Sequence, residues 1–324
     1  MNKLDLIDKK ILYELDLNSR ISFKELGKKL NIAKETASFR VKRLVKNGYI
    51  KNFITTILTS NLNRFYYKLF FKFHKTTPEI DKEIIEFIRN NKTTAYLASL
   101  EGRYDVIFLI LSKDMRDLYS FLVPFREKFG EYVSEQEILT MPEVHKFNFR
   151  FFYENGKLLH TKYPVELSEP KIDNLDYIII KTLAKNSRTN LIEIAQITKT
   201  ETNVVKYRIK KLKQANIIGT HVLDINIEKF GLQQFQISYS LKNLTSINKI
   251  IEFVSQIPQS TFATVTLGKY DLAVEFAVKN GKELREIMNN IKTQFADEIN
   301  DHEVFIMEEH KINWFPFELE NNNP

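Results

Sequence analysis

Phe39-Arg40-Val41-Lys42-Arg43-Leu44 has a second version 168 residues further along the chain, Tyr207-Arg208-Ile209-Lys210-Lys211-Leu212. The two hexapeptides agree in chemical class at every position. The agreement extends outward, because 12 of 47 positions are identical without a gap between residues 4–50 and 172–218. This period is too long for a solenoid repeat, so we infer that a unit large enough to enclose its own core has been duplicated.

The bulk composition is that of a globular protein, with 324 residues, 43% apolar and 27% charged. The apolar runs are far shorter than the roughly 18 residues that a membrane span requires. The acidic residues near the start argue against a signal peptide. The absence of cysteine excludes disulfides and thiolate metal sites and is typical of a cytoplasmic protein.

Positive charge is concentrated in the two matching segments. The net charge of the chain is +7, whereas residues 34–51 and 202–219 carry +5 each, so the other 288 residues sum to −3. A net charge alone says little about partners, but this distribution favours a polyanion that meets both segments.

The first part of each copy has the apolar spacing of three short helices. Ile7, Ile11 and Leu15 lie three or four residues apart and therefore share a helix face. A second helix is expected after Ser22, an N-cap with Glu25 three positions later as a capping box.

A third helix then carries Ala37, Val41 and Leu44 inward. It ends at Gly48, which suits a left-handed backbone, and Asn216 replaces this glycine in the second copy with the next most tolerant residue.

The second part of each copy changes to period two and predicts a β-α-β-β-α-β succession, the split ferredoxin-like motif with helices on one sheet face. Because Tyr67, Leu69, Phe71 and Phe73 alternate along the first strand, we expect an aromatic face that packs on a second sheet supplied by the duplicate. The chain is thus predicted to be α+β, with the segments 1–60 (helix-turn-helix), 61–153 (ferredoxin-like effector domain), 154–171 (linker), 172–228 (helix-turn-helix) and 229–318 (effector domain).

Two helices joined by a short turn, the second of them basic, form a helix-turn-helix, whose second helix enters the major groove of DNA. A basic helix taken alone is more often a solvated surface, but two copies that hold the whole positive excess favour DNA. The predicted DNA-binding residues are Lys34, Glu35, Ser38, Phe39, Lys42, Arg43 and Lys46 in the first copy, and Thr202, Asn203, Lys206, Tyr207, Lys210 and Lys211 in the second.

Arg40 and Arg208 are treated differently because they lie beside the inward stripe of their helices. A partly buried arginine needs a carboxylate. We therefore predict ion pairs with Asp8 and Asp176 on the first helix of each copy rather than contacts with bases.

Several short motifs in order resemble the Lrp/AsnC, or feast/famine, family of transcription regulators: Leu4-Asp5-x-x-Asp8-x-x-Ile11-Leu12, Asn18-Ser19-Arg20, Arg40-Val41-Lys42-Arg43-Leu44 and Gly48-Tyr49-Ile50. The resemblance covers nearly the whole chain, one family member per half. It implies a prokaryotic DNA-binding regulator whose effector domains pair through their sheets and often respond to amino acids. The chain departs from the family pattern at Ala33, where a Ser or Thr cap is usual, at Asn216, and in the turn before the third helix of the second copy.

The Gly-x-Tyr-Asp segments at 102–105 and 268–271 leave two interpretations open. A glycine and an aspartate between two strands are typical of a hairpin turn. The resemblance implies instead a small-molecule pocket, possible effector ligands being Gly102, Tyr104, Asp105, Gly268, Tyr270 and Asp271.

An enzyme on the same architecture is the main alternative, since siroheme decarboxylases resemble it. Their His-rich, Tyr-Asn-Leu-Trp-Phe-like segment is missing, because the corresponding strands read Tyr104-Asp105-Val106-Ile107-Phe108 and Tyr270-Asp271-Leu272-Ala273-Val274. No metal-ligand spacing, phosphate loop or nucleophile elbow occurs either. We expect no enzyme, no cofactor and no metal. A further alternative is that the helical units mediate only assembly.

The sequence therefore predicts a regulator in which one chain supplies both halves of a pseudo-dimer on double-stranded DNA, with further homo-oligomers left open. Lys34, Glu35 and Ser38 differ from their counterparts Thr202, Asn203 and Lys206, so the two half-sites should differ as well. Effector identity, target genes and the sign of regulation are not encoded in these patterns.

Overall fold

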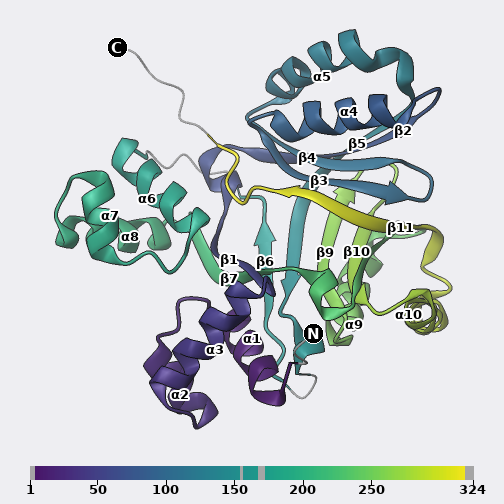
Figure 1. Cartoon of the computed structure of the whole chain (residues 1–324). Coiled ribbons are helices and arrows are strands. Elements are labelled where there is room, and N and C mark those ends of the chain that lie inside the picture. Colours follow the sequence, from purple (N-terminus) through teal and green to yellow (C-terminus); the bar gives the residue numbers. More distant parts are fainter. Residues whose placement is uncertain (1–3, 154–155, 167–171, 318–324) are drawn as a thin grey trace, which may run out of the picture. The chain divides into compact units, whose positions relative to one another are not determined.

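The computed structural model describes residues 4–153, 156–166 and 172–317, and these form two compact units. The first, here called the helical unit, comprises residues up to 58, 147–160 and 170–232. The second, the sheet unit, comprises 59–146, 161–169 and the chain from 233 onward. Figure 1 shows the helices and strands of each unit. Among the described helices, none is long and apolar enough to cross a lipid bilayer.

The helical unit holds both predicted three-helix segments, each followed by a strand. Its elements are α1 (Leu6–Leu17), α2 (Phe23–Leu30), α3 (Lys34–Lys46), β1 (Ile50–Ile57), the 3-10 turn η3 (Arg150–Phe152), α6 (Asn174–Lys185), α7 (Leu191–Thr198), α8 (Thr202–Gln214), β7 (Ile218–Ile225) and the 3-10 turn η4 (Ile227–Phe230).

The helix ends follow the predicted chemistry with one shift. Ser22 caps α2, because its side chain accepts a hydrogen bond from the backbone N–H of Glu25 at 3.1 Å. The reciprocal capping box lies instead at the start of α1, between Asp5 and Asp8, and again at the start of α6. Gly48 has a φ of +73°, and its counterpart Asn216 a φ of +52°, which confirms the left-handed position in both copies.

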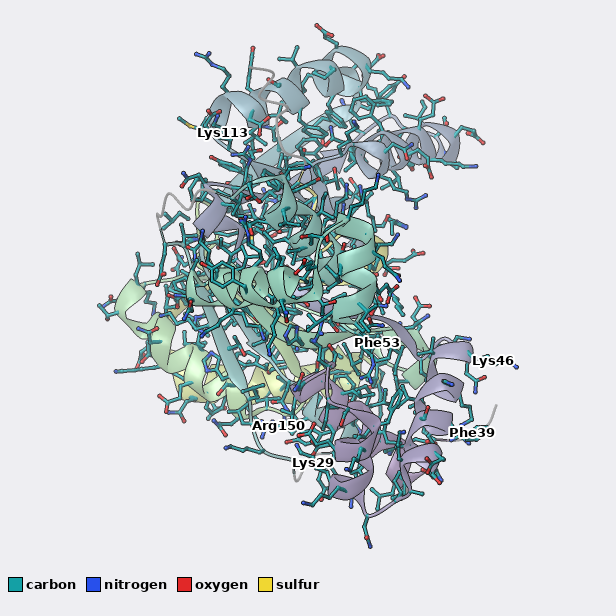
Figure 2. The ribbon with its side chains drawn as sticks, turned by 90° about the vertical axis from the view of Figure 1, so that its left-hand side faces the viewer. Lys29, Phe39, Lys46, Phe53, Lys113 and Arg150 are labelled. Atoms are coloured by element: carbon teal, nitrogen blue, oxygen red, sulfur yellow. The ribbon has the colours of Figure 1, made fainter. Side chains whose placement is uncertain are left out.

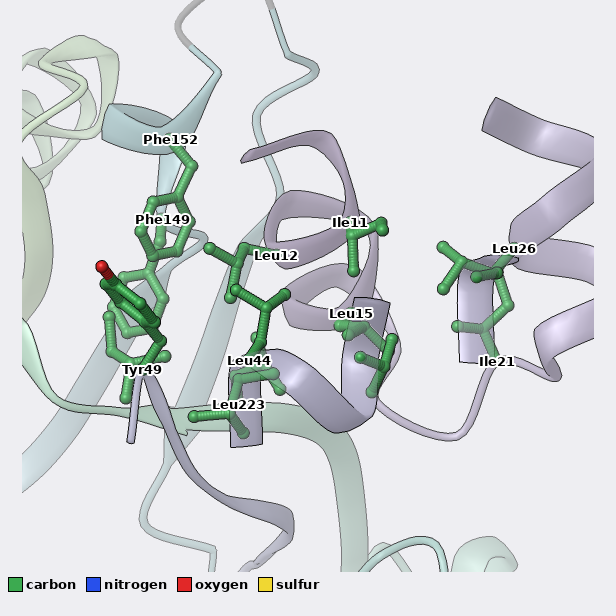
Figure 3. Close-up of a cluster of buried hydrophobic side chains, with 14 residues drawn as sticks. Ile11, Leu12, Leu15, Ile21, Leu26, Leu44, Tyr49, Phe149, Phe152 and Leu223 are labelled. Atoms are coloured by element: carbon green, nitrogen blue, oxygen red, sulfur yellow. The ribbon is translucent and has the colours of Figure 1, made fainter. Parts of the chain in front are cut away.

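Neither three-helix segment closes its own core. β1 and β7 pair antiparallel, with Phe53 opposite Leu223. β7 packs on α1 and β1 packs on α6, so each strand covers the helices of the other copy. The core around α1 accordingly includes Leu223, and it also includes Phe149, just before η3, and Phe152, at the end of η3 (Figure 3). Burial of these side chains ties β7 of the second copy to the helices of the first.

The sheet unit contains the β-α-β-β-α-β succession twice, which confirms the α+β fold. Its first copy is β2 (Phe65–Phe73), α4 (Pro78–Asn90), β3 (Thr94–Glu101), β4 (Val106–Ser112), α5 (Met115–Phe129) and β5 (Val133–Phe147); its second is β8 (Gln233–Leu241), α9 (Ile247–Gln256), β9 (Ser260–Leu267), β10 (Leu272–Val278), α10 (Gly281–Phe295) and β11 (Ile299–Ile312). The 3-10 turns are η1 (Thr59–Leu62), η2 (Gly130–Tyr132) and η5 (Leu244–Ser246).

The two sheets join at their edges as well as through their faces. The first half of β5 pairs with β2 of its own copy, whereas its second half, around Glu143, pairs with β9 of the other copy. β11 does the same with β8 and then β3. The eight strands therefore close into a ring, which leaves no long free edge exposed between the copies.

Sheet-on-sheet packing was predicted correctly, but through the wrong residues. Leu69 and Phe71 lie under α4 and α5, in the cluster that also contains Phe125 (Figure 1). The opposite face supplies Phe70, which packs with Phe305 of the second copy at 5.6 Å between ring centroids. The face with Phe70 also carries Lys68, and both of these side chains are buried, so alternation alone could not tell which face the helices cover.

Two further expectations were wrong in detail. The last strand of the first effector domain ends at Phe147, and Phe149, which the predicted segment 61–153 assigns to that domain, is a core residue of the helical unit. The segment expected to be only a linker contains the strand β6 (His160–Pro164), next to β5 in the sheet. Residues 154–155 and 167–171 of that segment lie outside the described residues.

Candidate nucleic-acid interface

The outer face of α3 carries most of the predicted contacts of the first copy. Ala37, Val41 and Leu44 are buried, which fixes the rotation of the helix about its axis. The opposite side is exposed, and Figure 2 shows Phe39 and Lys46 at the outer edge of the domain. Ser38 is half-buried, and the exposed residues of this face are Lys34, Glu35, Phe39, Lys42 and Lys46.

The outer face of α8 matches it. Val205 and Leu212 are buried, Thr202 is half-buried, and Asn203, Lys206, Tyr207, Lys210 and Lys211 are exposed.

Each of these helices exposes an aromatic side chain at the same position. Phe39 is 66% exposed and Tyr207 is 64% exposed. A large apolar side chain in water loses the stabilisation that burial would supply, so a partner that covers it contributes binding energy. An aromatic ring in the major groove can contact the thymine methyl group.

Arg40 and Arg208 form the ion pairs that the sequence predicted. Arg40 lies 2.7 Å from Asp5 and 3.0 Å from the buried Asp8. Arg208 lies 2.8 Å from Asp173 and 3.1 Å from Asp176. The hydrogen bond from Arg40 lowers the pKa of the Asp5 carboxyl, which favours the charged pair. These two arginines therefore hold the third helix of each copy against the first.

Arg43 was predicted among the outward residues, but its guanidinium is engaged inside the domain. Its Nη2 donates to both carboxylate oxygens of Asp8, at 2.8 and 2.6 Å. The corresponding residue of the second copy is Lys211, which is exposed. Within the described part of the chain, Oδ1 of Asp176 is buried without a hydrogen-bond partner. One arginine-to-lysine difference thus places the charge inward in one copy and outward in the other.

The second helix also differs between the copies. α2 exposes Lys24, Lys28 and Lys29, although Lys29 pairs with Glu14 at 2.6 Å. The aligned residues of α7 include Ile192 and Ile197, both at least half exposed. An open hollow of about 530 Å³ runs along α7 to the start of α8. The first domain is therefore the more basic beside its third helix, α3.

The Gly-x-Tyr-Asp segments of the sheet unit are well-ordered turns. Tyr104 and Tyr270 are buried in the core between the two sheets. Asp105 Oδ2 accepts from the backbone N–H of Phe73 at 2.6 Å, and Asp271 Oδ2 accepts from that of Leu241 at 2.7 Å. Packing and turn formation therefore account for these four residues. Gly102 and Gly268 have φ values of +149° and +141° and supply the backbone freedom of the turns.

A polar cluster accompanies these turns. Lys269 Nζ donates to Glu303 at 2.9 Å and to the Tyr104 hydroxyl at 3.3 Å. The Tyr270 hydroxyl also donates to Glu303, and Arg103 lies 3.5 Å from the same carboxylate. Burial, together with the hydrogen bond to Glu303, raises the pKa of Tyr270. Cations and a carboxylate from both copies thus meet at one place, which the sequence pattern had not connected.

The structure also brings together residues whose role the sequence had left open. Ser19 and Arg20 meet Ser187 and Arg188 in the interior of the helical unit. Asn-Ser-Arg is the longest run of identical residues in the aligned copies, which was the available signal. Among the described residues, no group of three or more His, Cys, Asp or Glu side chains is placed to hold a metal ion.

Comparisons with known proteins agree with this arrangement. The winged helix-turn-helix DNA-binding family matches residues 4–51 and again 172–218. The HTH-type transcriptional regulator Ptr1 of Methanocaldococcus jannaschii is 36% identical over 124 residues, which is 37% of this chain and 79% of that protein. The HTH-type transcriptional regulator LrpA of Pyrococcus abyssi is 28% identical over 126 residues, 37% of this chain and 84% of that protein.

A solved structure resembles the chain over almost its whole length. The siroheme decarboxylase NirDL aligns with a TM-score of 0.66 over 95% of this chain and 93% of its own, at 11% sequence identity. At that identity the likeness concerns the fold alone. The full tandem arrangement of helical and sheet units therefore also occurs in a protein of a different named activity.

Proposed function

We propose that this chain, which belongs to the Lrp/AsnC family of helix-turn-helix transcriptional regulators, regulates transcription by binding double-stranded DNA with α3 and α8. The observation that carries this proposal is the duplicated recognition helix. Both helices expose a face with lysines, and they lie in the two segments that contain the whole positive excess of the chain; the exposed lysines are Lys34, Lys42 and Lys46 on α3 and Lys206, Lys210 and Lys211 on α8. A polyanion with two adjacent grooves is the partner that this charge fits.

The two helices are expected to read different bases. The start of a recognition helix meets base edges, and here α3 presents Lys34 and Glu35, whereas α8 presents Thr202 and Asn203. Asparagine is suited to adenine, lysine to guanine and glutamate to cytosine. The preferred operator is therefore an imperfect palindrome, because one chain with two different helices is not bound by symmetry.

Selection of tight binders from random double-stranded DNA tests the proposal. The expected result is two unlike half-sites and an affinity that falls steeply as salt rises, since phosphate contacts release counterions. Strictly symmetric sites would contradict the division between α3 and α8. Absence of salt-sensitive binding to any duplex would favour the alternative in which the helical unit mediates only assembly.

An amino acid is the proposed effector of the sheet unit, at the polar cluster beside the Gly-x-Tyr-Asp turns. Arg103 and Lys269 would attract a carboxylate and Glu303 an ammonium group, so the charges suit a zwitterion. Isothermal titration with a panel of amino acids tests this. Heat that is lost in Glu303→Gln supports the site, and no heat with any amino acid contradicts it.

The chain is proposed to lack enzymatic activity, and the fold likeness to NirDL makes one specific alternative testable. The protein is incubated with an iron tetrapyrrole, separated from free ligand and examined by absorbance. No stoichiometric band is expected. A bound tetrapyrrole that loses carboxyl groups would overturn the proposal.

Whether the pseudo-dimers associate further is measured by sedimentation of the purified protein.

A further inference from the structure

Two serine-centred turns meet in the middle of the helical unit. Ser19 lies between α1 and α2, and Ser187 lies at the same place between α6 and α7; both are fully buried. Their hydroxyl oxygens are 2.7 Å apart. The N–H of Ser19 donates to the carbonyl of His221 on β7, and the N–H of Ser187 donates to the carbonyl of Phe53 on β1, at 2.9 and 2.7 Å. Each turn is thus fastened to the strand of the other copy.

The neighbouring arginines add further hydrogen bonds between the two copies. Arg20 Nη1 donates to the carbonyl of Ser187. Arg188 Nη1 donates to the carbonyls of Ser19 and Ile21, at 2.7 and 3.0 Å. Asn18 and Asn186 hold the turns themselves, since each side-chain oxygen accepts from the backbone N–H of the following arginine at 3.0 and 2.9 Å.

These arginines are held in an unusual setting. Both are half-buried, and within the described residues neither has a carboxylate partner. The Arg188 guanidinium instead covers the rings of Phe23 and Phe53, at 4.5 and 5.3 Å from their centroids. Burial lowers the pKa of both guanidinium groups, although they stay charged at any pH that the fold tolerates. A desolvated cation without a counter-charge is costly, so carbonyl and aromatic contacts to the other copy must offset that cost.

The strand pairing alone is a weak connection between the two domains. β1 and β7 form a sheet of only two strands, and their register is interrupted near both ends, between Ile50 and Asn52 and between Thr55 and Ile57. Two-stranded ribbons twist over a wide range, and bulges add local bending. The packing of β7 on α1 and of β1 on α6 adds a connection, but hydrophobic contact is non-directional, so directional hydrogen bonds are needed to fix the angle between α3 and α8.

We propose that the paired Asn-Ser-Arg turns, 18–20 and 186–188, form a clasp that sets the distance and angle between α3 and α8, and thereby the half-site spacing that the protein accepts. Arg20 and Arg188 are positioning residues in this proposal and touch no DNA. The inference rests on the proposed DNA binding for its functional half. Its structural half is measurable without DNA.

The DNA-free experiment uses the absence of cysteine in the native chain. Spin labels are attached to Lys46→Cys at the end of α3 and Gln214→Cys at the end of α8, and the distance distribution between them is recorded by double electron–electron resonance. A narrow distribution is expected in the otherwise native chain and a clearly broader one in Arg20→Ala/Arg188→Ala. Arg285→Ala, which removes an exposed arginine of the sheet unit, is the control and should leave the width unchanged.

If the double variant does not fold, Arg188→Lys takes its place. Lysine retains the charge and most of the aliphatic stem but cannot reach two carbonyls with a planar fork. The distribution should broaden less than in the alanine pair but more than in the control. An unchanged width in a folded clasp variant would overturn the proposal.

The DNA experiment uses operators whose two half-sites are moved apart in steps of one base pair. Each step rotates one half-site by about 34° around the helix axis, so a rigid protein should lose about tenfold or more in affinity on either side of its preferred spacing. The clasp variants should lose clearly less affinity when the spacing is changed. Their affinity for an isolated half-site should equal that of the native chain. An equally sharp profile at uniformly lower affinity would mean that the turns stabilise the fold without setting the spacing.

The two experiments separate the two proposals. If the native chain binds no duplex, the proposed function fails while the label distances still decide whether the clasp fixes the domains. If the native chain binds DNA and the width of the distance distribution is the same in the variants, only the clasp proposal is contradicted.

Discussion

The two three-helix domains, residues 4–51 and 172–218, have the same plan but distribute their charges differently. In the first, Asp8 accepts hydrogen bonds from both Arg40 and Arg43. In the second, Asp176 pairs with Arg208, and Lys211, the counterpart of Arg43, faces solvent. The first domain therefore uses cationic charge for its own cohesion, where the second leaves it available. Two identical subunits could not differ in this way, so the difference is a consequence of the tandem arrangement.

A second difference acts on the core. Asp16 at the end of α1 is buried, and its carboxylate accepts from the backbone N–H of Phe149 at 2.7 Å. The aligned residue in α6 is Ala184. The Asp16 carboxylate thus binds α1 to the segment that follows β5. The second domain has no carboxylate at the corresponding position. We expect the first domain to resist unfolding more strongly, since hydrogen bonds to charged groups are the stronger ones.

The largest expected effect comes from removing the shared carboxylates. Asp8→Ala removes the carboxylate partner of Arg43 and one of the two carboxylate partners of Arg40, which keeps Asp5, and should lower the free energy of unfolding by about 3 kcal/mol. Asp176→Ala affects one guanidinium and should cost about 1 to 2 kcal/mol. Urea unfolding of both variants measures the difference. Equal losses would show that Arg43 contributes nothing to the cohesion of the first domain.

The next effect concerns DNA affinity at the matched lysines. Lys42→Ala and Lys210→Ala should each weaken binding to all sequences alike, by about tenfold at low salt, because these side chains are expected to meet phosphates. Each should also reduce the slope of log affinity against log salt by about 0.9. Fluorescence anisotropy over a salt series provides both numbers. A loss confined to one sequence would identify the lysine as a base contact instead.

His221 on β7 should produce a pH effect that has no counterpart on β1. Burial lowers the pKa of His221 to about 4, and the charges of Lys213 and Arg20 act in the same direction. The folded protein therefore holds the neutral form, while the unfolded chain takes up a proton below pH 6.5. Stability from this group is complete above about pH 7 and is lost as the pH falls from about 6.5 to about 4, by up to about 3 kcal/mol.

The substitution that tests this prediction is taken from the first copy, which has Phe53 at the position aligned with His221. His221→Phe should flatten the stability curve in this pH range relative to the native chain. Other histidines titrate in both proteins and cancel in the difference. An identical pH dependence in the two proteins would contradict the assigned pKa.

The smallest expected effect comes from exchanging the residues that distinguish the domains. Lys211→Arg gives Asp176 a second guanidinium and should raise the free energy of unfolding by about 0.5 kcal/mol, since one buried acceptor becomes satisfied. Arg43→Lys should lower it by a similar amount. Thermal unfolding measures both. DNA affinity should fall in Lys211→Arg and rise in Arg43→Lys, opposite to the change in stability. If affinity and stability changed in the same direction, the charge would not be shared between domain cohesion and DNA binding.

Local chemistry made part of this structure predictable. The bounds of α4, Pro78–Asn90, follow from a proline at the first turn and an apolar spacing of three and four. The ion pair of Arg40 followed from one helix face meeting another. The role of Arg43 did not, because a residue at the edge of the buried stripe can turn either way, and the length of its side chain decides which carboxylate it reaches.

By itself the sequence determined the duplicated plan, the type of nearly every helix and strand, and the face of α3 and α8 that carries positive charge. These properties depend on side-chain periodicity and on caps within a few residues. Only the tertiary structure decided that each strand covers the other copy's helices, that β5 and β11 close the sheet into a ring, and that the Asn-Ser-Arg turns meet. Such contacts join residues roughly 115 to 215 positions apart, and which of several apolar or polar partners is chosen depends on the packing of the whole core rather than on any local pattern.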